Sequence, residues 1–187
     1  DPELTRAEEL FQRQLWADAE KAFLTYALRS ARDPSAAASA FCRAGVCRLS
    51  AGNDRGAEEL FERVLSDPAA AKNAPDAAAA AFDQLHVILL KQGKRPAREK
   101  LIARCRKALP DSPAAARIAE REGDARLESG AADKALEYYA LAGRGLSAAG
   151  ADAVRLLSPK KSGLSLPPLS ESDAGLLAGV AAAKPAC

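Results

Sequence analysis

The chain has 187 residues, of which 45 are alanine and only 5% are aromatic, and its formal net charge at pH 7 is +2. Alanine is the best helix former and strand formers are scarce, so the composition argues against an all-β or parallel-sheet fold. A charge this close to zero argues against a strongly basic nucleic-acid-binding protein. The apolar runs fall short of the ~20 residues of a membrane span, which predicts a soluble chain.

Prolines predict where four helices begin, since proline suits the first helical position and a preceding Asp or Ser can cap it. These prolines are Pro2, Pro34, Pro75 and Pro113. Glycines predict the turn that follows three of these helices, because glycine adopts positive φ at a helix end. The turns contain Gly52, Gly93 and Gly130. The chain is therefore expected to form four helix–turn–helix units, over about 2–31, 34–66, 75–108 and 113–144.

A small residue followed four positions later by a large apolar one recurs in the second helix of each unit. The pairs are Ala19/Phe23, Ala57/Phe61, Ala97/Leu101 and Ala135/Tyr139. Residues four apart share one helix face, so these pairs mark the inner faces of four similar helices. The small residues are separated by 38, 40 and 38 positions, which indicates an internal repeat.

This pattern resembles the tetratricopeptide repeat (TPR) family, whose unit of 34 residues has small residues, a glycine and an aromatic at fixed positions. The second unit fits well, through Gly45, Gly52, Ala57 and Phe61, and the fourth through Gly123, Gly130, Ala135 and Tyr139. The first has Ala7 and Gln14 in place of both glycines, and in the third Leu85 replaces a small residue while Gly93 falls one position late. The resemblance covers about residues 2–144 and implies an all-α, right-handed superhelical solenoid.

In TPR arrays the first helix of each unit lines a concave face that commonly carries the ligand contacts. The resemblance therefore implies a groove with candidate binding residues on three of the first helices, Cys42, Arg43, Val46, Leu49, Phe82, His86, Leu89, Glu120 and Asp124. Phe82, Val46 and Leu89 are expected to be exposed there, and a partner segment is expected to bind chiefly by apolar burial. The alternative is that several of these residues contact neighbouring helices instead.

The C-terminal part of the chain departs from the repeat. Residues 146–157 predict a further helix that closes a repeat domain spanning 1–158. A Pro- and Ser-rich loop follows, and a capping pattern predicts a last helix at about 171–183. That helix is either a cap or the first half of a truncated repeat. The chain opens directly into a helical pattern without methionine, which suggests an N-terminus that was truncated or processed.

The residues that could carry chemistry are few, and we expect no enzyme, cofactor or metal site. His86 is the only histidine and lies in an apolar helical stretch, which favours a buried structural role over a catalytic base. No phosphate-binding loop or dinucleotide-binding glycine motif is present. The cysteines Cys42, Cys47, Cys105 and Cys187 have no zinc-binding spacing, and we expect them to be free thiols in apolar surroundings.

A basic run in the third unit is a second candidate site, for an anion or an acidic partner. Its main members are Lys94, Arg95, Arg98, Arg104 and Lys107. No aromatic residues for base stacking are interleaved with these cations, which argues against nucleic acid. The alternative is a solvated helix face whose charge is balanced by acidic residues of neighbouring helices.

The sequence therefore predicts a non-catalytic scaffold that binds a protein or peptide partner. Two alternatives stay open: a carrier of a small hydrophobic ligand in a bacterial cell-envelope protein, and a self-assembly module of a larger repeat protein, which implies a homo-oligomer. The alanine-rich, methionine-free composition suggests a bacterial origin, and the compartment is either the cytoplasm or the periplasm.

Overall fold

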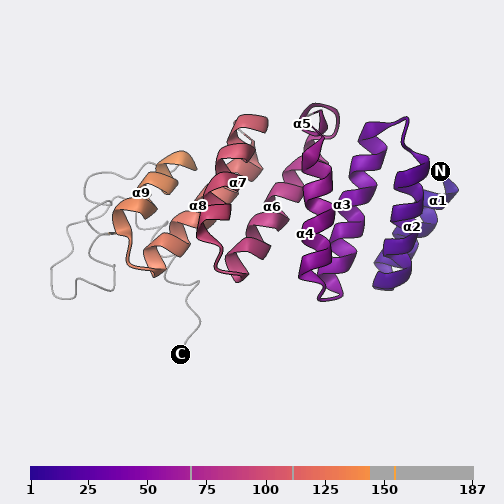
Figure 1. Ribbon diagram of the computed structural model, residues 1–187, viewed down its shortest axis with the longest axis horizontal. Helices are drawn as coiled ribbons and strands as arrows, with labels where there is room; N and C mark the ends of the chain where they lie inside the picture. The colour runs from indigo at the N-terminus through magenta and orange to yellow at the C-terminus, as the bar shows by residue number, and fades with distance from the viewer. Residues whose placement is uncertain (68, 111, 144–153, 155–187) are drawn as a thin grey trace. The chain divides into compact units, whose positions relative to one another are not determined.

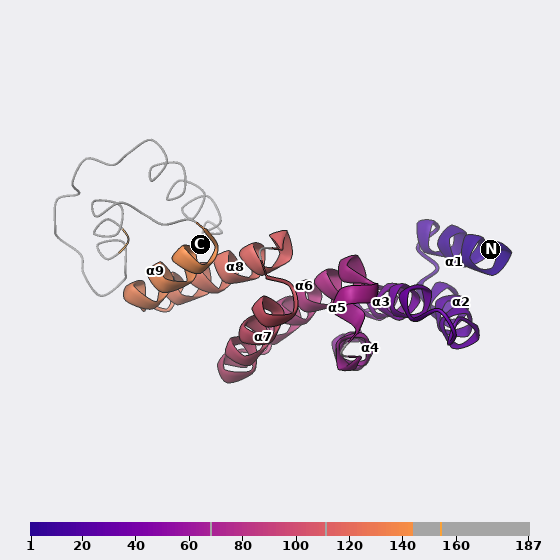
Figure 2. The same cartoon turned by 90° about the horizontal axis from the view of Figure 1, so that it is seen from above.

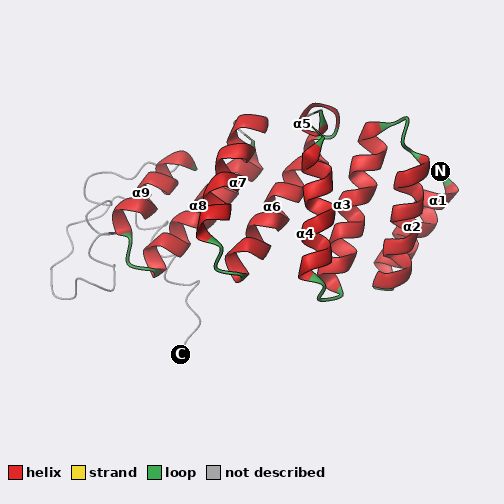
Figure 3. Cartoon of the chain, in the orientation of Figure 1, coloured by secondary structure: helices red, strands yellow, loops and turns green. Residues whose placement is uncertain are grey.

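The computed structural model of the chain describes residues 1–67, 69–110, 112–143 and 154, and every regular element among them is a helix (Figure 3). The first four helices are α1 (Pro2–Gln12), α2 (Trp16–Arg29), α3 (Pro34–Ser50) and α4 (Asp54–Ser66). A short helix, α5 (Ala70–Asn73), precedes α6 (Pro75–Lys91) and α7 (Arg95–Ala108). The last two are α8 (Pro113–Glu128) and α9 (Ala132–Leu141). The predicted all-α class is confirmed for this part of the chain.

The chain divides into two compact units, residues 1–115 and 116–187. In the first unit α1/α2, α3/α4 and α6/α7 form helical hairpins that follow one another along the chain (Figure 1). The hairpins are joined by contacts of α2 with α3 and of α4 and α3 with α6. Figure 2 shows α4 and α7 on the same side of α3 and α6. The unit is thus a row of similar hairpins, each packed on the next.

The helices begin at the four prolines named above, and in three cases a polar side chain caps the start. Oδ1 of Asp1 accepts a hydrogen bond from the amide of Glu3 at 2.9 Å, and Oδ1 of Asp33 accepts two at 3.0 Å. Oγ of Ser112 accepts one from Ala115 at 3.1 Å. The predicted helix starts are therefore confirmed. Proline leaves no amide hydrogen to satisfy there, and the cap satisfies the amides that follow.

One turn geometry closes the first helix of all four described hairpins. Its central residue has positive φ, 59° at Gln14, 79° at Gly52, 66° at Gly93 and 79° at Gly130. The next residue donates a backbone hydrogen bond to the carbonyl five positions earlier, for example from Leu15 to Leu10 at 3.0 Å. This is the Schellman arrangement, which satisfies carbonyls that the helix end leaves without partners.

Each hairpin is packed at positions that lie sixteen residues apart. A Cβ built on Gly45 would lie 2.7 Å from Cε1 of Phe61, and one on Gly123 would lie 2.6 Å from Cε1 of Tyr139. The matching positions are Ala7 with Phe23 and Leu85 with Leu101, and all four are buried. The described helices are therefore repeat-like in packing as well as in turn geometry.

The main departure from this regularity is α5, which is inserted between the second and third hairpins. Residues 67–74 lie between the second and third predicted units and were assigned to neither. Asp67 begins it, with Oδ1 accepting a hydrogen bond from the amide of Ala69 at 2.8 Å. The short helix contacts α3, α4 and α6, and Ala70 is buried. The insertion accounts for the longer spacing of 40 residues at this point in the sequence.

In the second unit α8 and α9 share a small apolar core. Its buried members are Leu127, Ala132, Ala135, Tyr139 and Val154. Val154, which is helical, is the one described residue of the helix predicted over 146–157. The rest of that helix, the loop that follows it and the helix predicted at 171–183 lie outside the described residues.

Candidate functional site

Four of the nine residues predicted to line a groove on the first helices are buried instead. Cys42, Phe82, His86 and Leu89 are only 6%, 2%, 0% and 5% exposed. The expectation that Phe82 and Leu89 face solvent is therefore wrong, because both belong to the core. Arg43 is exposed, and Val46 and Leu49 are half-buried.

The reason lies in the composition of α6, which is apolar around nearly its whole circumference. A helix of this kind is stable when neighbours enclose it, whereas a helix at a surface keeps one polar face. In the structure α3, α4, α5 and α7 all contact α6. The sequence carried this signal in the run from Ala77 to Leu90, which leaves few polar positions for a solvent face.

Arg43, which is exposed on α3, already makes intramolecular contacts. Its guanidinium lies 5.4 Å from the ring centroid of Phe11, and Nη2 is 3.7 Å from a carboxylate oxygen of Glu8. Both partners belong to α1. Arg43 thus links the first two hairpins, and its charge is shared with a neighbouring carboxylate.

The acidic candidates of α8 belong to the second unit, and both Glu120 and Asp124 are half-buried. Oδ1 of Asp124 accepts a hydrogen bond from the hydroxyl of Tyr139 at 2.8 Å. Burial, together with this hydrogen bond, raises the pKa of Tyr139 far above its usual value. Asp124 therefore positions the aromatic ring that packs against Gly123.

The basic run of α7 meets a row of carboxylates on α4. Asp54, Glu58 and Glu62 are spaced four residues apart, so they lie on one stripe of that helix. Asp54 pairs with Lys91 at 4.0 Å and Glu58 with Lys94 at 3.8 Å. This arrangement supports the alternative in which neighbouring helices balance the basic run.

Arg104 is held by contacts with both α4 and α6. Nη1 lies 2.8 Å from Oε2 of Glu62, and Nη2 donates to the carbonyl of Leu65 at 2.5 Å. The guanidinium also lies 5.9 Å from the ring centroid of Phe82. Arg98 is buried at 6% exposure, whereas Arg95 and Lys107 are exposed.

An open apolar pocket of about 250 Å³ lies beside α5, and we call it the α5 pocket. The C-terminal end of α4, the short helix α5, the first half of α6 and the last turns of α7 form its walls. Its apolar lining residues are Leu65, Ala70, Ala71, Ala78, Phe82 and Ala108. Its charged lining residues are Asp67, Arg104 and Lys107. The pocket therefore brings one predicted groove residue, Phe82, together with two members of the predicted basic patch.

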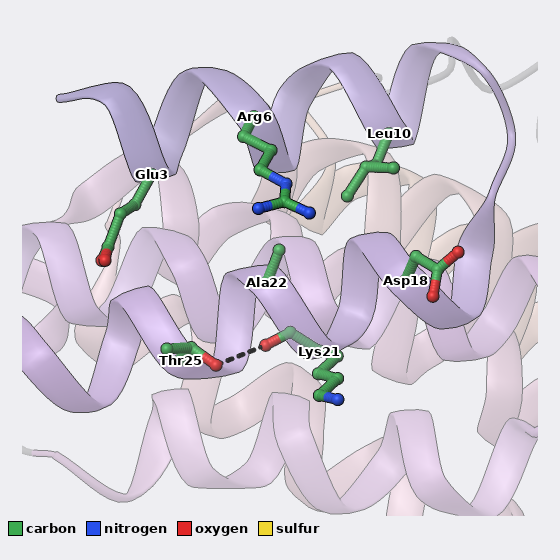
Figure 4. A pocket seen from close by; sticks show the side chains of 7 residues that line it. All are labelled: Glu3, Arg6, Leu10, Asp18, Lys21, Ala22 and Thr25. Carbon is green, nitrogen blue, oxygen red and sulfur yellow. Dashed lines mark hydrogen bonds between the residues drawn. The ribbon is translucent and has the colours of Figure 1, made fainter.

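Two other pockets are lined mainly by charged side chains. One, of about 460 Å³, lies along α4 at the α6–α7 turn and is lined by Arg55, Glu58, Glu59, Glu62, Gln92 and Lys94. The other, of about 430 Å³, lies between α1 and α2 and is lined by Glu3, Arg6, Leu10, Asp18, Lys21, Ala22 and Thr25. Figure 4 shows Arg6 extending from α1 toward α2. Charges of both signs line each of these pockets.

The buried cysteines are not activated for chemistry. Cys42, Cys47 and Cys105 are buried free thiols, as expected from the sequence. Burial raises the pKa of each to about 11, so the reactive thiolate is scarce at neutral pH. Among the described residues no three His, Cys, Asp or Glu side chains are grouped so that they could hold a metal ion.

None of the helices described in the structure has both the length and the apolar character that crossing a bilayer requires.

The lining of the α5 pocket contributed by 67–74 was missed at the sequence level. A four-residue helix is too short to give a periodic pattern, and Ala70 and Ala71 lack distinctive side chains. The available signal was Asp67-Pro68 before three alanines, which is a capping residue and a proline ahead of good helix formers.

Comparisons of the chain with protein-family models, with curated proteins and with solved structures found no match.

Proposed function

We propose that this chain is a TPR-like helical-repeat module that binds a segment of a partner protein. The observation that carries the proposal is the α5 pocket, an open apolar pocket formed where two consecutive hairpins meet an inserted helix. Peptide-binding surfaces are commonly built from such pockets on a rigid helical frame. The repeated hairpins, with their shared turn and sixteen-residue packing register, support the TPR-like part of the proposal.

The proposal moves the binding surface away from the first-helix groove. Phe82 contributes to the α5 pocket from within the core, and His86 and Leu89 support α6 from inside the fold. On this view the buried candidates hold the frame rigid, and the residues that meet a partner come from α5 and from the end of α7.

Pocket size favours a peptide partner over a carried hydrophobic molecule. Sites for small molecules commonly measure about 300–1,000 Å³ and bury most of the ligand. The α5 pocket measures about 250 Å³ and is open, and the two larger pockets described above are lined mainly by charged residues. One side chain of a bound segment fits such a pocket better than a whole lipid-like molecule.

Self-assembly has weaker support than partner binding. The large apolar side chains exposed on the described surface are Leu15, Leu28 and Leu141, at 39%, 62% and 41%. Leu15 and Leu28 lie at opposite ends of α2 and Leu141 ends α9, and single exposed leucines are ordinary on protein surfaces. The exposed surface therefore favours partner binding over self-assembly.

Peptide selection tests the proposal directly. A random peptide library displayed on phage is selected against the folded chain, and enriched peptides are measured by isothermal titration calorimetry. We expect peptides that bind the folded chain and lose binding when it is unfolded in urea. If repeated selections yield no peptide that binds the folded chain better than an unrelated helical protein, the proposal fails.

Two variants then locate the binding surface. Ala108→Trp fills the α5 pocket from an exposed position, and Val46→Lys places a charge on the first-helix face from a half-buried one. Binding at the proposed surface predicts that the first change weakens the enriched peptides and the second does not. If Val46→Lys weakened the peptides and Ala108→Trp did not, the binding site would be the groove first expected from the sequence.

A further inference from the structure

We propose that the α5 pocket receives one large apolar side chain of a partner segment and that Lys107 binds a carboxylate beside that side chain. This inference rests on the proposed function, because it names the chemistry of the segment. The pocket brings together two features that are separate in the sequence. One is the apolar stretch that contains Phe82, and the other is the basic run that contains Arg104 and Lys107.

The walls of the pocket define the apolar part of the ligand. Phe82 and Leu65 are the large apolar lining residues, although they are only 2% and 8% exposed, and alanines of α5, α6 and α7 make up the rest of the apolar lining. A cavity of about 250 Å³ accommodates one aromatic or large aliphatic side chain with part of its backbone. Anchors of this kind, seated in a preformed pocket, usually dominate the affinity of a bound segment.

Arg104 lines the pocket, but its guanidinium is already paired within the protein. Glu62 and the carbonyl of Leu65 hold its guanidinium in place, at 2.8 and 2.5 Å. The carboxylate of Asp67, which also lines the pocket, accepts a hydrogen bond from the amide of Ala69. These contacts fix both groups in the unliganded protein.

Lys107 differs from its neighbours in the pocket. Among the described residues its ammonium makes no ion pair or hydrogen bond, although it lines the apolar pocket. A cation in the last turn of a helix is favourable for the helix alone, and Arg106 occupies that same turn. The helix dipole therefore explains both residues equally, whereas only Lys107 lies at the pocket.

Charge complementarity selects the partner. A carboxylate next to the apolar anchor would meet the ammonium of Lys107, whereas a lysine or arginine there would be repelled by it. Asp67 is the one opposing charge in the lining. The segment is thus an acidic peptide with a phenylalanine or leucine flanked by Glu or Asp.

Alanine methyl groups provide a direct probe of the pocket, because Ala71, Ala78 and Ala108 line it. Protein labelled with ¹³C at alanine methyls is titrated with the capped peptide Gly-Ser-Glu-Phe-Glu-Ser-Gly. Two matched peptides replace Phe by Ala or both Glu by Lys. We expect the first peptide to shift the pocket methyls selectively, with the methyl of Ala17 on α2 as the unaffected reference. Each matched peptide should bind at least several-fold more weakly.

Three variants test the two halves of the inference. Ala108→Trp should weaken the acidic peptide about ten- to hundredfold, since it occupies the space of the anchor. Lys107→Glu should weaken it about two- to fivefold and reduce the salt dependence of binding. Arg106→Glu makes the same charge change on the neighbouring residue and should leave the affinity unchanged. The resonances distant from the pocket report whether each variant is folded.

The inference is overturned if the basic peptide shifts the pocket methyls as strongly as the acidic one, or if Lys107→Glu and Arg106→Glu have equal effects. It is also overturned if decanoate shifts these methyls and the peptide does not, because the occupant would then be a lipid carboxylate. Peptides enriched from the library that bind with the pocket methyls unmoved would remove this inference and leave the proposed function standing. A failure of both experiments removes both.

Discussion

The aromatic ring of Phe61 occupies the position where a side chain at Gly45 would begin, with Cε1 at 2.7 Å from that point. The same relationship recurs between Tyr139 and Gly123, at 2.6 Å. In both hairpins a glycine of the first helix lets an aromatic side chain of the second helix lie against its backbone. Real Cβ atoms do not approach other atoms this closely, so the glycine is required by the ring and not by its backbone conformation.

Gly45→Ala is therefore expected to destabilise the first unit. In an open helix this substitution gains about 1 kcal/mol, because alanine is the better helix former. Here the added methyl overpacks a fully buried ring, and we expect a net loss of about 1–2 kcal/mol in the free energy of unfolding. Urea denaturation measures the change. Combining it with Phe61→Leu should remove most of the added cost, and a stabilised Gly45→Ala would show that the ring can move aside.

Gln14→Gly is expected to stabilise the protein. Gln14 has φ of 59°, a conformation that costs a residue with a side chain about 1 kcal/mol, and glycine occupies the equivalent position in the other three turns. The residue is exposed. We expect a gain of about 0.5–1 kcal/mol in urea denaturation at an unchanged m-value. Gly52→Gln is the reverse change at the matching turn and should lower the free energy of unfolding by a similar amount. If both variants were stabilised or both destabilised, the positive φ would not explain the effect.

Arg48→Met should cost about 1–3 kcal/mol of stability. Nε of Arg48 lies 2.7 Å from Oε1 of Glu20, and Nη1 donates to the carbonyl of Gly56 at 3.1 Å, so this side chain joins α2, α3 and α4. Charge-assisted hydrogen bonds that are three-quarters shielded from water are worth more than surface ones. The control is Arg55→Met, whose side chain is 92% exposed and should change stability by less than about 0.5 kcal/mol. Equal losses would refute this role.

Arg126→Met is expected to destabilise the second unit by about 3–5 kcal/mol, because it leaves the carboxylate of Glu122 buried without its arginine. The two side chains are 5% and 0% exposed, and Nε of Arg126 lies 2.7 Å from Oε1 of Glu122. The double variant Glu122→Leu with Arg126→Met should recover much of this loss, since neither member of this ion pair is then charged. Thermal unfolding followed by circular dichroism compares the three proteins. A double variant less stable than the single one would contradict this account.

Alkaline pH should weaken the fold through its buried thiols. The pKa of Cys105 is raised to about 11 by burial and by the charge of Asp83, against 9.0 for an unperturbed thiol. The folded state keeps the proton, so its stabilising effect is complete below pH 9 and is lost as the pH rises from 9 to 11. The lost free energy reaches at most about 1.4 kcal/mol per pH unit for each thiol.

Cys105→Ala isolates this contribution. The variant will be less stable at neutral pH because it leaves a small cavity, but its stability should fall less steeply between pH 9 and 11 than that of the wild type. The slopes of unfolding free energy against pH are compared, not the absolute values. Parallel slopes would mean that the thiol proton is not linked to folding.

The local architecture was largely predictable from the sequence, because its signals are local. A proline after Asp1 and Asp33 fixes two helix starts, and glycine at 52 and 130 fixes two turns, each by the conformations that one residue allows. The sixteen-residue register follows once both helices of a hairpin are known. These features need no knowledge of what lies beyond the hairpin.

The candidate site was less predictable, because it depends on which helix faces are covered. The apolar surface of α6 is so extensive that periodicity alone cannot say which stripe stays open, and Phe82 and Leu89 proved to be buried. The α5 pocket depends on a four-residue helix and on Arg104 and Lys107 reaching it from α7. Contacts between residues this far apart in the chain produce no periodic pattern in the sequence.

A surface made of repeated hairpins offers a ligand several nearly equivalent places to bind. The insertion of α5 makes the two junctions between hairpins of the first unit different, because α5 packs against α3, α4 and α6 at one of them. Under the proposed function, a partner that recognises α5 would bind in a single register and in a one-to-one stoichiometry. An interruption of the repeat thus supplies the uniqueness that repetition by itself does not.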